Sequence, residues 1–87
     1  MASRYPEQRK RLTGIYWTAE FGEIQVSNGD TVTWSNFDAS GSTDVHSYLM
    51  KKIDGAVMTT TDLANVSTVT GAGTEVPCVY LVYGVKA

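Results

Sequence analysis

The side chains that most often carry out chemistry are scarce in this sequence. The single histidine, His46, lies next to Asp44 and Ser47, and these three residue types form the centre of many acyl-transfer enzymes. In a strand, however, Asp44 and His46 share one face while Ser47 points to the other. The sequence also lacks the Gly-x-Ser-x-Gly pattern that exposes a nucleophilic serine. We therefore predict that the protein is not an enzyme and that His46 lies exposed or hydrogen-bonded at the start of a strand.

The other candidate ligands and nucleophiles give no stronger signal. Cys78 is the only cysteine, which excludes an internal disulfide, and its apolar neighbours predict a small buried side chain. No phosphate-binding loop, dinucleotide fingerprint or Cys-x-x-Cys pair is present. The acids and hydroxyls of residues 38–44 do not follow EF-hand spacing, so we interpret them as a polar loop, with calcium as an open alternative. We predict no catalytic residues, no cofactor and no metal.

One segment is similar to a known family. Residues 26–36 read Val-Ser-Asn-Gly-Asp-Thr-Val-Thr-Trp-Ser-Asn, which resembles the cupredoxin segment in which Gly-Asp-Thr-Val-Thr-Trp precedes a copper-ligand histidine. Here His46 and Cys78 follow. Copper in that family needs two histidines, a cysteine and usually an axial methionine, but no histidine or methionine follows Cys78. We therefore interpret the segment as an ordinary hairpin.

The fold class follows from composition and alternation. The chain has 87 residues, of which 43% are hydrophobic and 18% charged, so one ordered domain is expected. Valine and threonine are abundant and favour strands. Turn residues at Asn28-Gly29 and Asp54-Gly55 predict two hairpins, the second with Lys51 opposite Met58. We predict an all-β fold, a small antiparallel β-sandwich or flattened barrel with these six to seven strands: residues 15–19, 23–26, 31–35, 45–53, 56–60, 66–70 and 76–85. Residues 61–65 are interpreted as a helical turn or a loop.

Charge divides the chain into an N-terminal arm, residues 1–12, and a single β domain, residues 13–87. The arm carries a charge of +3 and the rest a charge of −5, which together give the net charge of −2. A basic arm can dock on an acidic neighbour, remain solvated or contact nucleic acid, and the acidic body disfavours the last. The arm residues that we expect to contact a partner are Arg4, Tyr5, Arg9, Lys10 and Arg11.

The final strand, residues 76–85, is apolar on both faces. Val76, Cys78, Tyr80 and Val82 alternate with a second apolar set, and a small antiparallel domain can cover only one of the two sets with its own core. The other set must meet a second sheet or another chain. The strand residues that we expect at a subunit seam are Val79, Leu81, Tyr83 and Val85.

These features favour a structural role over an enzymatic one. In size, composition and β layout, the chain resembles the small Val/Thr/Gly-rich proteins of bacteriophage virions, such as capsid decoration proteins and small head or tail components. The resemblance implies a homo-oligomer or a contact with a major capsid or tail protein, made in the host cytoplasm and located in the virion. No stretch is long enough to cross a membrane, and the N-terminus has no apolar signal region.

A binding module for glycans or another small ligand is the alternative function. It would use the loop over residues 37–44 together with aromatic side chains on alternating strand positions. The aromatic residues considered for such a platform are Tyr16, Trp17, Trp34, Tyr48, Tyr80 and Tyr83.

Overall fold

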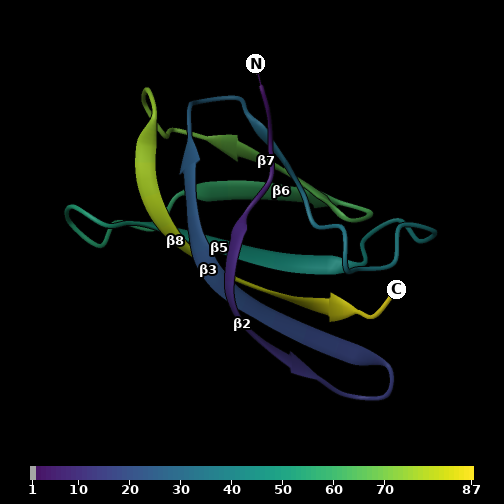
Figure 1. The fold of residues 1–87 in the computed structure, drawn as a ribbon. Helices are drawn as coiled ribbons and strands as arrows, with labels where there is room; N and C mark the ends of the chain where they lie inside the picture. Colours follow the sequence, from purple (N-terminus) through teal and green to yellow (C-terminus); the bar gives the residue numbers. More distant parts are fainter. Residues whose placement is uncertain (1) are drawn as a thin grey trace.

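The computed structural model describes residues 2–87 as two four-stranded β-sheets (Figure 1). The strands are β1 (Ser3–Arg4), β2 (Glu7–Thr13), β3 (Trp17–Val26), β4 (Thr31–Thr33), β5 (Val45–Lys51), β6 (Thr59–Leu63), β7 (Val66–Thr70) and β8 (Val76–Val85). The first sheet has the order β1-β4-β7-β6 and the second has the order β2-β3-β8-β5. The pairings between these named strands are antiparallel except that of β1 with β4. The predicted all-β class is confirmed. Within residues 2–87, no helix is long and apolar enough to cross a membrane.

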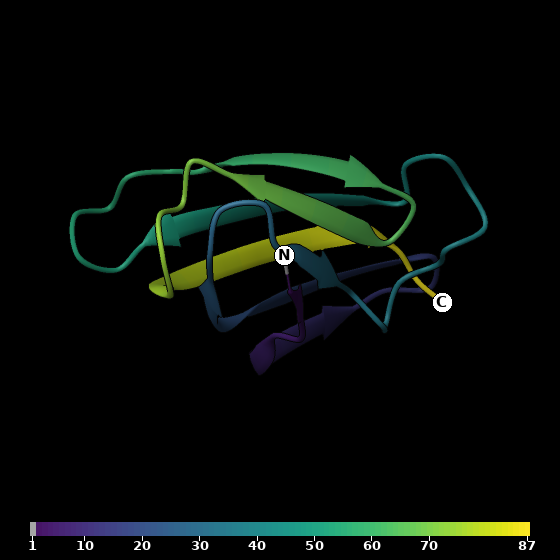
Figure 2. The same ribbon diagram turned by 90° about the horizontal axis from the view of Figure 1, so that it is seen from above.

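The two sheets enclose one apolar core. Seen from above, β6 and β7 lie on one side of the molecule and β2 and β3 on the opposite side (Figure 2). Burial alternates with a period of two along β3 and β8, because successive strand side chains point to opposite faces. Of the set Val76, Cys78, Tyr80 and Val82 on β8, the last three are buried and Val76 is partly buried against the core. The other buried hydrophobic residues are Ile24, Val26, Val32, Trp34, Phe37, Val45, Leu49, Met58, Val69 and Ala72.

The first predicted hairpin is wrong. Asn28-Gly29 does form a tight turn, in which Gly29 has a φ of 85° and the Asp30 amide donates to the Ser27 carbonyl at 3.0 Å. The strands on either side of the turn nevertheless belong to different sheets, because β4 pairs with β1 and β7 while β3 pairs with β2 and β8. Alternation predicted correctly that Val32 and Trp34 are buried, but alternation does not specify the partner strand.

The second predicted hairpin is shorter than expected and has a different register. Met50 pairs with Val57 in a single bridge, whereas the prediction placed Lys51 opposite Met58. After the turn the chain leaves the second sheet, and β6 pairs with β7 in the first. Residues 61–63, interpreted as part of a helical turn or loop, form the end of β6. The β-branched run of three threonines, residues 59–61, explains why this segment is a strand.

A buried polar network joins the two sheets on one side of the sandwich. The Trp34 indole donates to the Ser67 hydroxyl at 2.8 Å, and Ser67 donates to the Asp62 carboxylate at 2.5 Å. Ser47 of β5 donates to the same carboxylate at 2.7 Å. The network satisfies polar groups that would otherwise be costly to bury, and it holds β5 of the second sheet against β6 and β7 of the first.

The N-terminal segment joins the sheets on the other side. Strand β1 pairs with β4 at the edge of the first sheet, and β2 pairs with β3 at the edge of the second. The residues predicted as an arm therefore supply edge strands to both sheets of their own chain. Met1, the first residue of that segment, lies outside the described residues.

Close packing of β2 on β3 leads to the first testable prediction. A Cβ added at Gly22 would collide with the Glu7 carbonyl oxygen and would lie 2.7 Å from the Tyr80 ring. We expect Gly22→Ala to lower the free energy of unfolding by about 3 kcal/mol, because overpacking forces the two strands apart. Urea denaturation followed by circular dichroism measures this.

Gly55→Ala is the control for that variant. Gly55 has a φ of 75°, and no atom lies within 4 Å of an added Cβ. We expect Gly55→Ala to lower the free energy of unfolding by only about 1 kcal/mol, because its only cost is a strained backbone. An equal loss of stability in both variants would contradict the tight approach of β2 to Gly22.

Candidate functional site

The outward-pointing side chains of the second sheet form an exposed apolar surface, which we call the outer face. Six of its large side chains retain between 37% and 58% of their surface in contact with solvent. These six are Leu12, Trp17, Phe21, Tyr48, Met50 and Tyr83. Between them lie the smaller or half-buried outward side chains Ala19, Val79, Leu81 and Val85.

Strand register places these residues next to one another. In one row across the sheet, Leu12 pairs with Ala19, Ala19 with Tyr83, and Tyr83 with His46. In the next row, Phe21 pairs with Leu81 and Leu81 with Tyr48. Because side chains directly opposite one another lie about 4.5–5.5 Å apart at Cβ, the rows form one continuous surface on four strands.

Aromatic rings on the outer face stack against one another. The Tyr83 ring lies between those of its neighbours, with a centroid distance of 5.1 Å to His46 at an interplanar angle of 25°. Tyr48 stacks at 6.4 Å and 17°, and Trp17 is tilted by 33° at 6.3 Å. A side-chain hydrogen bond with Tyr48 raises the pKa of the Tyr83 phenol. The small interplanar angles mean that the His46, Tyr48 and Tyr83 rings lie nearly parallel on the outer face.

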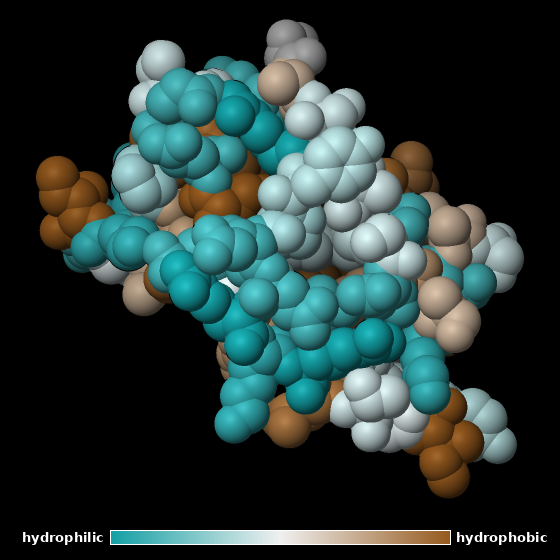
Figure 3. All heavy atoms as spheres, in the orientation of Figure 1, coloured by the Kyte–Doolittle hydropathy of each residue, from teal (hydrophilic) through white to brown (hydrophobic). Residues whose placement is uncertain are grey.

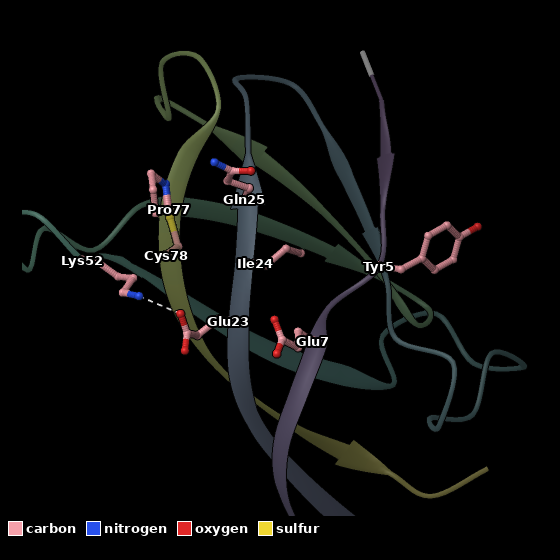
Figure 4. A pocket seen from close by; sticks show the side chains of 8 residues that line it. All are labelled: Tyr5, Glu7, Glu23, Ile24, Gln25, Lys52, Pro77 and Cys78. Carbon is pink, nitrogen blue, oxygen red and sulfur yellow. Dashed lines mark hydrogen bonds and ion pairs between the residues drawn. The ribbon is translucent and has the colours of Figure 1, made fainter.

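One end of the outer face is charged. Glu23 forms ion pairs with Lys52 at 2.6 Å and with Arg9 at 2.8 Å. Arg9 also lies 3.3 Å from Glu7. The hydrogen bond from Lys52 is the main reason that the pKa of Glu23 is lowered. Figure 4 shows Lys52 reaching Glu23, while Tyr5 points away from both. These three residues line a pocket of about 330 Å³. The two acids and two bases neutralise one another within the chain.

Apolar side chains also project at the two ends of the molecule. Ile15, at the turn between β2 and β3, is 83% exposed, and Ile53, in the loop between β5 and β6, is 88% exposed. In Figure 3 hydrophobic residues stand out at the left end and at the lower right end, where these two segments lie, whereas hydrophilic residues cover the centre of the view. The molecule measures 36 × 23 × 17 Å, so these apolar tips lie far from each other.

The four strand residues that we predicted at a subunit seam all lie on the outer face. Tyr83 is exposed, while Val79, Leu81 and Val85 are half-buried by their neighbours. The sequence reasoning did not assign Leu12, Phe21 or Met50 to this surface. Phe21 could have been found by extending the alternation of residues 15–19 through to residue 26, because β3 is one uninterrupted strand.

Arg4, predicted to contact a partner, is bound within its own chain. Its Nε donates to Asp30 at 2.7 Å, and its guanidinium also pairs with Glu75. Asp30 further accepts hydrogen bonds from the amides of Ala2 at 2.9 Å and Ser27 at 2.8 Å. These backbone amides, together with Arg4, lower the pKa of Asp30 to about 2.

The other predicted arm residues differ in their surroundings. Arg9 belongs to the charged cluster, and Arg11 donates to the Thr18 hydroxyl at 3.2 Å and lies 3.9 Å from Glu20. Tyr5 is 73% exposed. Lys10 is exposed opposite Phe21 at the edge of the outer face, and it forms no ion pair with any described residue.

The residues that could have formed a reaction centre are separated. Asp44 is buried and accepts the Gly41 amide at 2.8 Å, His46 points outward, and Ser47 points inward to Asp62. His46 and Cys78 lie on opposite faces of the second sheet, so they cannot share one metal ion. Burial raises the pKa of the Cys78 thiol. Within residues 2–87, no three His, Cys, Asp or Glu side chains gather where they could hold a metal ion.

Comparison with known proteins adds little to this geometry. No protein-family model matches the chain, and no curated protein matches it. Among solved structures, a cupin domain from Bordetella pertussis Tohama I is similar over 99% of this chain and 96% of that chain. The TM-score is 0.38 and the sequence identity is 12%, and a likeness at this level carries no functional argument.

The Asp30 cluster predicts a loss of stability in acid. Because the pKa of Asp30 falls from 3.8 to about 2 on folding, its contribution is fully present above pH 4 and is lost as the pH falls from 4 toward 2. We expect Asp30→Asn to lower the free energy of unfolding by about 2 kcal/mol at pH 7 and by much less at pH 2. Chemical denaturation at several pH values measures both.

Asp54→Asn, in an exposed turn, is the control for Asp30→Asn and should leave the pH profile of the wild-type protein nearly unchanged. A difference between Asp30→Asn and wild type that is the same at pH 2 and pH 7 would contradict the ionised tie between Asp30 and the N-terminal segment.

Proposed function

We propose that this protein is a structural component of a larger protein assembly, of the kind found in bacteriophage virions as decoration, head or tail proteins. Its outer face is the surface that another protein chain covers. The continuous exposed apolar surface on four strands carries this proposal. Soluble monomers rarely expose large contiguous apolar patches unless the patch binds something.

The size of the outer face supports a protein partner. A large side chain contributes about 150–250 Å² when fully buried, so six side chains exposed by 37% to 58% leave roughly 600 Å² of apolar surface in water. The largest patch on a typical monomer is about 300–600 Å², and each partner in a standard interface buries about 800 Å². The outer face therefore lies at the upper end of the range for monomers, where such patches are often functional, and reaches about three quarters of one side of a standard interface.

The arrangement of the aromatic rings favours a protein over a glycan. A sugar stacks on an exposed ring face, whereas Tyr83 directs a face toward His46 at 5.1 Å. Trp34 and Tyr80, two further residues considered for a sugar platform, are buried in the core against each other at 5.0 Å. Aromatic residues and methionine are enriched at protein interfaces, and the outer face exposes both kinds, such as Tyr48 and Met50.

The N-terminal segment has a supporting role in this proposal. Its arginines form ion pairs with acids of the same chain. These ion pairs hold β1 and β2 in place, and β2 forms one edge of the outer face. Lys10 and Tyr5 retain the predicted role of partner contacts, because both side chains are exposed.

A matched pair of leucine variants tests the proposed function. Leu12 on the outer face is 58% exposed, and Leu63 on the first sheet is 67% exposed. We expect wild type and Leu63→Glu to co-sediment with particles from the source in a density gradient. Leu12→Glu should reduce the particle-bound fraction at least tenfold, because it places a charge in an apolar contact. Quantitative mass spectrometry of the gradient fractions measures this fraction.

Two results would contradict the proposed function. The first is wild-type protein found only at the top of the gradient, free of any particle. The second is equal binding of Leu12→Glu and Leu63→Glu. Circular dichroism of both variants verifies that each remains folded.

A further inference from the structure

The charges on the second sheet are distributed so that the outer face can match a copy of itself. In the three rows that contain Trp17, Tyr83 and Leu81, the strands β3, β8 and β5 carry no Asp, Glu, Lys or Arg on the outward side. The next row brings in Glu23, and the charged cluster occupies that end only. The apolar part is therefore bounded by charge at one end and by Lys10 at the β2 edge.

We propose that two copies of this chain pack their outer faces against each other around a two-fold axis. The axis lies between the second sheet of one copy and the second sheet of the other. It passes over β8 at a point between Leu81 and Tyr83. This inference rests on the proposed function, since it names the occupant of the same surface. The resulting contact is isologous, because each copy contributes the same residues.

This placement gives the interface an apolar centre and a charged rim. Rotation about an axis that crosses the strands reverses the order of the rows, so Leu81 of one copy faces Tyr83 of the other. The charged cluster of one copy then lies at one end of the contact and that of the other copy at the opposite end, where Glu23 of one copy faces Trp17 of the other. Protein interfaces commonly have this arrangement, with charges depleted at the core and enriched at the rim.

The dimensions are consistent with face-to-face packing of two sheets. Stacked sheets lie about 10 Å apart with interdigitating side chains, and the outward residues of this sheet include both large and small ones. Two copies that each bury roughly 600 Å² reach about 1,200 Å² in total, the lower end of the range for specific interfaces. The centre of the contact requires a partner surface without charges. The outer face of a second copy provides such a surface of the same size.

Charged substitutions on the two sides of the axis test the inference. Light scattering coupled to size-exclusion chromatography should give wild type and Leu63→Glu a mass twice that of the 9.5 kDa chain at micromolar concentrations. We expect Leu81→Glu and Tyr83→Lys to raise the dissociation constant at least tenfold, because each buries two uncompensated charges per dimer. An equimolar mixture of the two variants should recover the dimer, because Glu at position 81 of one chain then faces Lys at position 83 of the other.

Each outcome decides between the alternatives. A monomeric wild type, or equal dissociation of Leu63→Glu, overturns the two-copy contact, and no recovery in the mixture overturns the position of the axis. Recovery also shows that both variants are folded.

If wild type is monomeric in solution yet sediments with particles, the face binds a different chain, and the proposed function stands while this inference fails. If wild type forms dimers that never join a particle, this inference stands while the proposed function fails. Saturable binding of soluble oligosaccharides to a monomer, lost in Tyr83→Lys, would replace both with the glycan module.

Discussion

Strand β8 is apolar on both of its faces. It lies between β3 and β5 in the second sheet, so its backbone is paired on both edges and its side chains determine what each face of the sheet contacts. Cys78, Tyr80 and Val82 fill the core between the sheets. No part of the chain from Ala2 onward forms a layer over the opposite set, and β3 and β5 add further apolar side chains to that side. The exposed outer face is the direct consequence.

The rest of the molecule stabilises the sheet that presents this face. The Asp62 network ties β5 to the first sheet, and the Asp30 cluster ties the N-terminal segment to the turn between β3 and β4. Both ties use buried or half-buried carboxylates that accept several hydrogen bonds, which keeps the sandwich closed at its two sides. Neither tie reaches the outer face, so the apolar surface remains accessible while the fold is complete.

Local patterns predicted the strands better than they predicted the pairings. The bounds of β7 and β8 follow from β-favouring residues between turn residues, the burial of Cys78 follows from its apolar neighbours, and the burial of Val32 and Trp34 follows from alternation. The strand that pairs with β4 does not follow from such local patterns, since a two-residue turn can connect two sheets as well as two strands of one hairpin. The presence of an apolar set on the outward side of β8 was predictable because both faces of this strand are apolar. Leu12 was not assigned to the surface, because this required the register of β2 on β3, whereas Phe21 required only that the alternation of residues 15–19 be extended along β3. The acids that hold Arg4 and Arg9 lie far from the arginines in sequence, so charge counting alone suggested a basic arm.

The central claim is that another protein chain covers the outer face in the native assembly. Hydroxyl-radical footprinting of that assembly, read by mass spectrometry, tests it most directly, since it reports the solvent exposure of individual aromatic side chains. The account predicts strong protection of Trp17, Tyr48 and Tyr83 relative to the denatured chain, with Tyr16 at the hairpin tip still modified. Rapid modification of Tyr48 and Tyr83, at a rate equal to that of Tyr16, would contradict it.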